Sequence, residues 1–279
     1  MRIGLLLSPR ARADRPAVRA IADGLESAGH GTWSAAVESI ADCTSRMERS
    51  DLLVSLGGDG AMLRVGLAAA AVEVPCMGIN FGRLGFLTEF EAHDFVGRIQ
   101  DLDFAAGWIE RRLLLDWAQV RDGQVIDRGS ALNDIVAARG QVARLVDILV
   151  HIDGVAVLGY RADGILVATP TGTTAYSLAL QSSIVHPAAE VISISPICPF
   201  RNSANGLVVD AGAKIEIKLS GFSEAALTID GTNLHKLRDG DVVSCRRSAR
   251  TVHFLRFGPA DYFYRDLADR LQLSPPPRS

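Results

Sequence analysis

The sequence contains few cysteines, no long apolar run and no excess of positive charge, and each absence excludes a class of protein. Its four cysteines, at positions 43, 76, 198 and 245, form no C-x-x-C pair, which argues against a disulfide framework and a structural zinc site. No stretch approaches the ~20 apolar residues that span a bilayer. A net charge of −3 gives no electrostatic case for binding nucleic acid or a membrane surface. We therefore expect a soluble, cytoplasmic protein with neither partner.

Two common phosphate-binding signatures are also missing. A Walker A loop requires G-x-x-x-x-G-K-[ST], and residues 159–164 have the glycine spacing, but Ile165 stands where the lysine should be. The G-x-G-x-x-G fingerprint of dinucleotide-binding folds is not found at the glycine turns either. If the chain binds phosphate, it does so by another device.

The first hundred residues alternate between strand-like and helix-like patterns. Strands are expected at 3–7, 52–56 and 74–79, and helices at 15–28, 60–71 and 92–102. Such alternation predicts an α/β domain with a mainly parallel sheet, which we place at residues 1–102.

After Trp108 the pattern becomes β-rich. Asp122-Gly123 and Asp153-Gly154 are typical hairpin turns, and short β-like runs continue to Cys245 with one expected helix at 173–182. These runs predict a C-terminal all-β domain over 103–258, with antiparallel sheets packed into a sandwich-like body. Residues 259–271 are expected to form a helix rich in Tyr and Phe, so that the tail 259–279 docks back on the N-terminal domain. Residues 274–277 are expected to be a disordered end.

The turn Gly57-Gly58-Asp59-Gly60 lies between an apolar strand and the start of a helix. Phosphates bind at such turns, because free backbone N–H groups and the helix dipole converge there. A carboxylate in this position repels phosphate, so Asp59 needs another purpose, and a role in chemistry is the economical explanation. The alternative is an ordinary turn in which Asp59 caps the helix.

A second segment runs from Asp163-Gly164 to Tyr176. The buried strand 165–168 is followed by the hydroxyl-rich turn 169–174, which offers hydroxyls and N–H groups to a polar ligand. Simple N-capping by Thr173 or Thr174 accounts for one hydroxyl but not for the cluster.

Two further polar segments accompany these turns. Asn133-Asp134 lies beside an apolar strand that it could simply terminate. The glycine-hinged loop 80–87 follows the third strand of the α/β domain, on the side where ligands bind in open sheets.

Taken together, these segments resemble the NAD kinase family. The resemblance covers nearly the whole chain: Gly-Gly-Asp-Gly, Asn-x-Gly-x-Leu-Gly-Phe-Leu at 80–87, the Asn-acidic pair, Thr-Pro-Thr-Gly-x-Thr-Ala-Tyr at 169–176, and Ile229-Asp230-Gly231. Phosphofructokinases and diacylglycerol-type lipid kinases share the first motif, whereas the threonine block is much more specific.

The resemblance implies an N-terminal α/β domain, a C-terminal β-sandwich and a site between them. It implies transfer of the γ-phosphoryl group of ATP to the 2′-hydroxyl of NAD's adenosine ribose, with Asp59 as general base, Mg²⁺ as the expected metal, and a homodimer or homotetramer. The metal ligands are not assigned. The implied phosphate loop consists of Gly57, Gly58 and Gly60. The implied NAD-binding positions are Asp59, Gly60, Asn133, Asp134, Arg144, Arg161, Asp163, Thr174, Ala175, Tyr176, Ser177, Leu178, Ala179 and Asn233.

The chain departs from the family pattern at three places. Ala61 replaces a common threonine, Asp134 replaces a frequent glutamate, and residues 179–183 lack two glycines found after the Ala-Tyr-Ser helix. Two alternatives therefore stay open beside the kinase: a lipid kinase of the same superfamily, and a non-catalytic NAD(P)-binding sensor.

Overall fold

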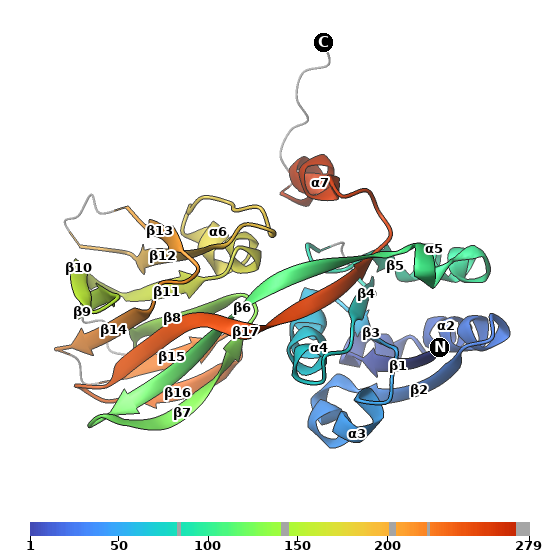
Figure 1. The fold of residues 1–279 in the computed structure, drawn as a ribbon, viewed down its shortest axis with the longest axis horizontal. Helices are drawn as coiled ribbons and strands as arrows, with labels where there is room; N and C mark the ends of the chain where they lie inside the picture. Colours follow the sequence, from blue (N-terminus) through green and yellow to red (C-terminus); the bar gives the residue numbers. More distant parts are fainter. Residues whose placement is uncertain (83–84, 141–144, 201–204, 222–223, 272–279) are drawn as a thin grey trace, which may run out of the picture. The chain divides into compact units, whose positions relative to one another are not determined.

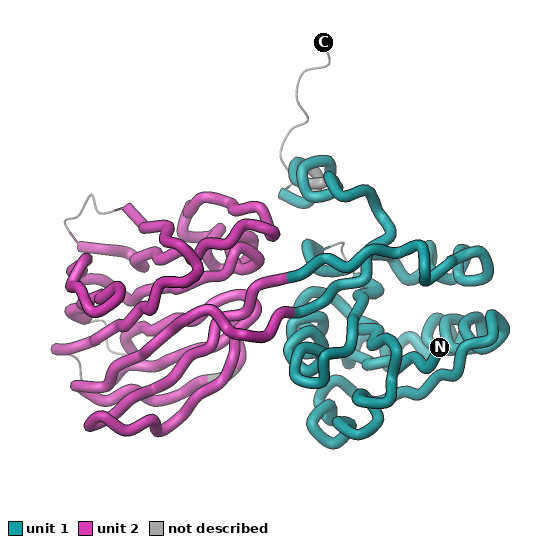
Figure 2. The backbone as a smooth tube through the Cα atoms, in the orientation of Figure 1, with its two compact units in different colours: residues 1–111, 252–279 teal, residues 112–251 magenta. Residues whose placement is uncertain are grey.

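The computed structural model describes residues 1–82, 85–140, 145–200, 205–221 and 224–271 (Figure 1). Arg144 and the predicted disordered end at 274–277 lie outside these described residues. The chain forms two compact units, residues 1–111 with 252–279, and residues 112–251 (Figure 2).

The first unit contains a parallel sheet with strand order β4-β3-β1-β2, and β5 pairs with β4. The strands are β1 (Arg2–Leu7), β2 (Gly31–Ala36), β3 (Leu52–Gly57), β4 (Cys76–Asn80) and β5 (Phe90–Glu91). The helices are α1 (Pro9–Ala13), α2 (Arg15–Ser27), α3 (Thr44–Met47), α4 (Asp59–Ala71), α5 (Ala92–Arg98) and α7 (Tyr262–Arg270). Short 3₁₀ turns lie at η1 (Val37–Cys43), η2 (Ile99–Asp101) and η3 (Phe104–Ala106). The predicted α/β fold class with a mainly parallel sheet is confirmed.

The sequence explains why this sheet forms. Every residue of β3 is buried, as expected for a continuous apolar run in a parallel sheet covered by helices. Helix α2 packs Ile21 and Leu25 into the same core as Ile3 and Leu5 of β1. The elements with no counterpart among the expected ones include α1 and the edge strand β2, whose sequence Gly-Thr-Trp-Ser-Ala-Ala carries a weak hydrophobic signal. The expected helix 92–102 ends at Arg98 and continues as a 3₁₀ turn.

The second unit consists mainly of antiparallel strands. Its strands are β6 (Trp108–Arg121) and β17 (Val242–Arg256), which both extend beyond the unit, and β7 (Gln124–Ala131), β8 (Asp134–Arg139), β9 (Val146–Ile152), β10 (Val155–Ala162), β11 (Gly164–Ala168), β12 (Val191–Ile197), β13 (Leu207–Asp210), β14 (Ile215–Ser220), β15 (Ala225–Ile229) and β16 (Asn233–Leu237).

These strands form two layers with one shared core. One sheet has the order β13-β12-β11-β8-β15-β16, and the other contains β10-β9-β14-β17 with the β6–β7 hairpin. A single buried apolar cluster includes Ile165 and Leu227 from the first layer and Ile148 and Ile215 from the second. The predicted sandwich-like all-β body is therefore confirmed.

Three Asp-Gly pairs turn the hairpins of this unit. Asp122, Asp153 and Asp230 have φ values of 49°, 50° and 48°, and the glycine that follows each also has positive φ. Positive φ at both central residues is the geometry that Asp-Gly favours in two-residue hairpin turns. The first two turns were expected and have two residues; the third Asp-Gly pair lies in the three-residue loop 230–232 that closes β15 onto β16.

The expected helix 173–182 is wrong in extent. The structure has a 3₁₀ turn η4 (Thr171–Thr174) and a single helical turn α6 (Tyr176–Ala179), separated at Ala175 by non-helical dihedrals. Among the described residues, no helix is long and apolar enough to cross a membrane.

Candidate functional site

Three neighbouring parallel strands of the first unit end at one sheet edge, where polar or glycine residues stand at the strand ends or directly after them. Leu7 of β1 pairs with Leu56 of β3, and Gly57 pairs with Asn80 of β4. The segments that follow, beginning at Ser8, Gly58 and Asn80, therefore start from the same edge. In open α/β sheets this carboxyl edge is where ligands bind.

Asp59 is the first residue of α4, and its carboxylate turns away from its own helix. Gly58 is the N-cap, and no side chain caps this helix. The Asp59 carboxylate instead accepts backbone hydrogen bonds from Phe86 N to Oδ2 at 2.8 Å and from Leu87 N to Oδ1 at 3.1 Å. The alternative of Asp59 as an ordinary N-cap is thus wrong. Two fixed N–H donors hold the carboxylate at the carboxyl edge of the sheet.

The three glycines of the turn have different surroundings. A Cβ on Gly57 would lie 2.8 Å from both the Ala61 Cβ and the Ser8 Oγ, so the absence of a side chain there permits packing within the protein. A Cβ on Gly60 would meet nothing within 4 Å, and one on Gly58 would meet only the Asn80 Oδ1 at 3.9 Å. Backbone N–H groups of the first helical turn lack partners within the helix. The open side of this turn is therefore at Gly58 and Gly60.

Asn80 contributes a buried amide beside that open side. Its side chain is only 2% exposed, and its Oδ1 accepts from Gly82 N at 2.8 Å. Its Nδ2 has no hydrogen-bond partner within the described part of the chain. A buried donor without a partner costs about 1–3 kcal/mol, so a ligand acceptor at this place would remove that cost.

A second polar cluster lies in the other unit, at the start of β8. Asp134 begins this strand and is 4% exposed, so the Asn133-Asp134 pair precedes a strand and does not terminate one. The Asp230 carboxylate accepts three backbone N–H groups, from Leu132 at 2.9 Å, Asn133 at 2.7 Å and Asp134 at 3.0 Å. A pocket of about 320 Å³ is lined by Asn133, Asp134, Val136, Ala175, Tyr176, Thr228, Asp230 and Gly231.

The two carboxyl groups of this pocket have raised pKa values. Burial raises the pKa of Asp134 to about 7, and the charge of Asp230 adds to the rise. Burial also raises the pKa of Asp230, although its three backbone hydrogen bonds oppose that change. Near neutral pH Asp134 is therefore partly protonated, and it can donate as well as accept a hydrogen bond. Asp230 was noticed in the sequence as part of a motif but not as a site residue; its Asp-Gly turn pattern points first to a hairpin.

The sequence predicted that the threonine-rich turn offers its hydroxyls to a polar ligand, whereas in the structure these hydroxyls bond within the protein. The hydroxyls of Thr169, Thr173 and Thr174 donate to backbone carbonyls, at 2.6, 2.6 and 3.0 Å. Thr171 Oγ1 accepts from Arg112 at 3.0 Å. A Cβ on Gly172 would lie 2.1 Å from the Asn133 carbonyl oxygen. The turn thus packs against Asn133 and holds it in place, and three of its four threonine hydroxyls donate to backbone carbonyls within the protein.

The remaining predicted NAD-binding positions fall in two places. Ser177, Leu178 and Ala179 lie on α6, directly after the pocket residues Ala175 and Tyr176. Asn233 opens β16.

Arg161 and Asp163 lie elsewhere. Arg161 is part of β10 in the other layer, whereas Asp163 directly precedes β11, at the end of that strand opposite the one paired with Asp134. In this register Ala168 pairs with Asp134, whereas Gly164 pairs with Ala138. Asp163 forms an ion pair with Arg139 at 2.5 Å, and the exposed Arg161 lies 3.9 Å from Asp147. The structure therefore brings Asn133 and Asp134 together with the start of α6, but not with Arg161 or Asp163.

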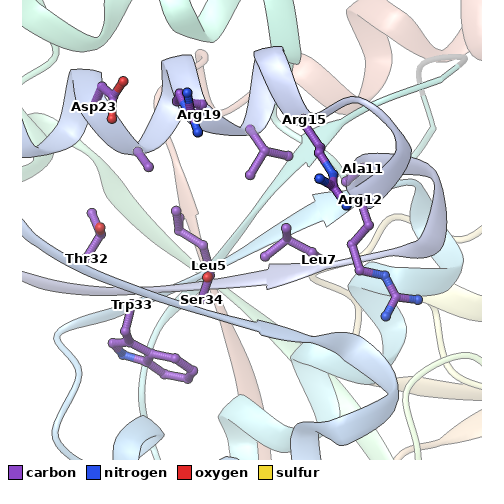
Figure 3. A pocket seen from close by; sticks show the side chains of 12 residues that line it. Leu5, Leu7, Ala11, Arg12, Arg15, Arg19, Asp23, Thr32, Trp33 and Ser34 are labelled. Atoms are coloured by element: carbon purple, nitrogen blue, oxygen red, sulfur yellow. The ribbon is translucent and has the colours of Figure 1, made fainter.

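A larger cavity of about 610 Å³ lies in the first unit between α2 and strands β1 and β2 (Figure 3). Arg15, Arg19 and Asp23 extend from α2 above Leu5 and Leu7 of β1. Neither Asp59 nor any described residue of the segment 80–88 lines it. The larger cavity of this unit is therefore not where the candidate residue Asp59 lies.

Comparison with known proteins assigns the architecture to a class. The fold resembles that of yeast NADH kinase solved with NADH (TM-score 0.82, 24% identity, 100% of this chain and 89% of that chain). It also resembles an NAD kinase from Archaeoglobus fulgidus solved with ATP (TM-score 0.75, 24% identity, 98% and 100%). At these identities the likeness defines the fold alone.

Sequence comparison then gives the family. The ATP-NAD kinase N-terminal domain matches residues 15–102, and the ATP-NAD kinase C-terminal domain matches residues 132–257. An NAD kinase from Dehalococcoides mccartyi strain CBDB1 is 32% identical over 272 residues, 97% of this chain and 96% of that protein. One from Thiobacillus denitrificans is 37% identical over 258 residues, 89% and 88%. The chain belongs to the NAD kinase family, as its motifs predicted, and the lipid-kinase alternative is set aside.

Proposed function

We propose that the protein transfers the γ-phosphoryl group of ATP to the 2′-hydroxyl of the adenosine ribose of NAD, giving NADP, with Asp59 as general base. The observation that carries this proposal is the position of the Asp59 carboxylate, which two backbone N–H groups hold at the open N-terminus of α4. The family assignment supports the substrates. The geometry supports the role of the carboxylate.

The chemistry requires one proton transfer and one displacement. A ribose hydroxyl is a poor nucleophile, and a carboxylate within hydrogen-bond reach can accept its proton as the oxygen attacks phosphorus. The new bond joins the 2′-oxygen to the γ-phosphorus, while the bond to the β,γ-bridging oxygen breaks and ADP leaves. Each Asp59 oxygen uses one acceptor direction on Phe86 or Leu87, which leaves further lone pairs for the substrate hydroxyl.

In this proposal the negative charge of the ATP phosphates is neutralised by backbone N–H groups, by side chains near α4 and by a divalent cation. Groups of three or more carboxylate, His or Cys ligands are not found among the described residues. Mg²⁺ usually binds one or two carboxylates together with substrate phosphates, and a single carboxylate such as Asp59 fits that requirement. When bound, Mg²⁺ would neutralise charge on the phosphate oxygens.

NAD recognition belongs in this proposal to the second unit. The pocket at Asn133 and Asp134 presents an amide and a partly protonated carboxyl, which suit ribose hydroxyls as donors and acceptors. The α6 residues, Arg144, Arg161, Asp163 and Asn233 remain proposed contacts. The division into domains at 102/103, the tail 259–279 docking on the first domain, a cytoplasmic location and a homodimer or homotetramer belong to the proposal as well.

The test is formation of NADP from NAD, ATP and Mg²⁺, followed with an NADP-dependent dehydrogenase. Asp59→Asn should lower kcat by about 10²–10⁴-fold, the usual contribution of a general base. Asp23→Asn is the matched control, because Asp23 is an exposed carboxylate of the same unit on α2 and should retain full activity.

Three outcomes separate the alternatives. No NADP from the wild-type protein would reject the enzyme, and NAD binding without turnover would then favour the NAD(P) sensor. An Asp59→Asn variant as active as the wild type would reject the base while leaving the reaction intact.

A further inference from the structure

The phosphate turn of this chain contains no cation of its own. In a Walker A loop a lysine follows the last glycine, whereas Ala61-Met62-Leu63 follow Gly60. Transfer of a phosphoryl group needs a cationic or metal partner for its oxygens. The first cation of α4, Arg64, lies a full helical turn beyond Gly60, so a positive side chain beside the turn itself has to come from another element.

Arg10 of α1 lies next to that place. Helix α1 begins directly after β1, because Ser8 caps it through a hydrogen bond from Ala11 N at 3.2 Å. The Arg10 Nη1 lies 2.7 Å from the point that a Cβ on Gly82 would occupy. The guanidinium thus packs against the backbone of the Asn80-Phe81-Gly82 turn, at the carboxyl edge of the sheet.

Asn80 links this guanidinium to the open turn. The Asn80 Oδ1 lies 3.6 Å from the Cβ point of Gly82 and 3.9 Å from that of Gly58. The Arg10 guanidinium, the Asn80 amide, whose Nδ2 has no partner among the described residues, and the N-cap of α4 are therefore neighbours at this edge of the sheet. All three present N–H donors, which is the composition of an anion site.

Arg10 also differs from the arginine two residues further along. Arg12 forms an ion pair with Glu38 at 3.0 Å. Arg10 is exposed and forms no ion pair with any residue that the structure describes. Its charge is therefore available to an anionic ligand.

We infer that Arg10 binds the phosphates of the nucleoside triphosphate donor, together with the Asn80 Nδ2 and the N-terminus of α4. This inference rests on the proposed function, and it assigns to Arg10 the electrostatic task that a lysine performs in a Walker A loop. It also explains Gly82, since any side chain at that position would displace the guanidinium from the turn.

The test compares Arg10→Ala, Arg10→Lys and the matched control Arg12→Ala, each checked for an unchanged melting temperature. Arg10→Ala should lower kcat/KM for ATP by about 100-fold or more, the loss expected for one transition-state donor, while KM for NAD changes less than threefold. Arg10→Lys should recover part of the loss, and Arg12→Ala should stay within threefold of the wild type.

A second readout keeps the inference independent of turnover. Calorimetric titration with ATP and Mg²⁺ should show that Arg10→Ala weakens ATP binding at least tenfold, whereas Arg12→Ala does not. Wild-type ATP affinity in Arg10→Ala overturns the inference, even if the protein makes no NADP. Equal loss in the Arg10 and Arg12 variants overturns it too, because a general charge effect then suffices. An inactive wild type with Arg10-dependent ATP binding rejects the proposed reaction alone.

Discussion

Arg256 donates from Nη1 to the carbonyl oxygen of Leu87 at 3.2 Å, and the N–H of the same Leu87 holds the Asp59 carboxylate. The Arg256 side chain is 2% exposed and forms ion pairs with Glu89 at 3.0 Å and Glu110 at 2.9 Å. From α7, Arg270 donates to the Gly85 carbonyl. The segment that positions Asp59 is thus fixed by arginines of the C-terminal part of the chain.

Replacing Arg256 should destabilise the protein strongly. Arg256→Ala leaves Glu89 and Glu110 buried without their cation, and removing one partner of a buried pair typically costs about 3–5 kcal/mol. Urea denaturation measures this loss. The control Arg265→Ala removes an exposed pair with Asp261 and should cost no more than about 0.5 kcal/mol. Similar losses for the two variants would show that the buried network contributes nothing specific.

Gly85→Ala should damage activity more than stability. A Cβ at this position would lie 2.1 Å from the Asp59 Oδ1, so either the segment or the carboxylate must move. We expect kcat to fall about 100-fold, since misplacement of a catalytic group by about 1 Å has an effect of this size. Gly97→Ala is the control, because it has open space on α5 and should be fully active. Normal activity of Gly85→Ala would mean that this segment does not position Asp59.

Asp134 should make stability fall with rising pH. Because its pKa rises from 3.8 to about 7 on folding, the folded state binds more protons than the unfolded state between these values. The contribution of Asp134 is therefore most favourable below pH ~4 and is lost as pH rises to about 7, by roughly 4 kcal/mol at most.

Asp134→Asn removes this titration and should flatten the dependence of the unfolding free energy on pH between 4 and 7. Asp210→Asn, a substitution at an exposed carboxylate of β13, should leave the slope as in the wild type. Unfolding titrations at several pH values measure both, and an unchanged slope in Asp134→Asn would contradict the raised pKa.

Sequence patterns predicted those parts of the fold that depend on interactions between residues close together in the chain. Asp122-Gly123 and Asp153-Gly154 could be placed in hairpins because their left-handed dihedrals suit few other residue pairs. The alternation of apolar runs with amphipathic segments was sufficient to predict the parallel sheet of the first unit. The edge strand β2 was missed because its short, small and polar residues gain their structure from pairing with β1.

The sequence singled out polar residues as candidates for the site, but not the hydrogen bonds that each of them forms. Asp59 was singled out because it is a carboxylate in a turn suited to phosphate. Its hydrogen-bond partners are Phe86 and Leu87, and no spacing rule connects these positions with residue 59. The threonines of 169–174 were interpreted as ligand donors, although three of them bond to backbone carbonyls nearby. Sequence patterns show which groups are present, whereas tertiary packing decides where each hydrogen bond goes.

The donors that hold Asp59 belong to the main chain, and this affects how the site tolerates genetic variation. Side chains at 86 and 87 can be exchanged without removing either hydrogen bond, since every residue except proline supplies the same N–H group. A mutational scan should therefore show broad acceptance at Phe86 with proline as the inactivating exception, whereas Leu87, which is 3% exposed, should accept other apolar residues but neither proline nor a charge. The placement of the carboxylate is encoded in the path of the backbone, and exchange of the Phe86 side chain leaves both donors in place.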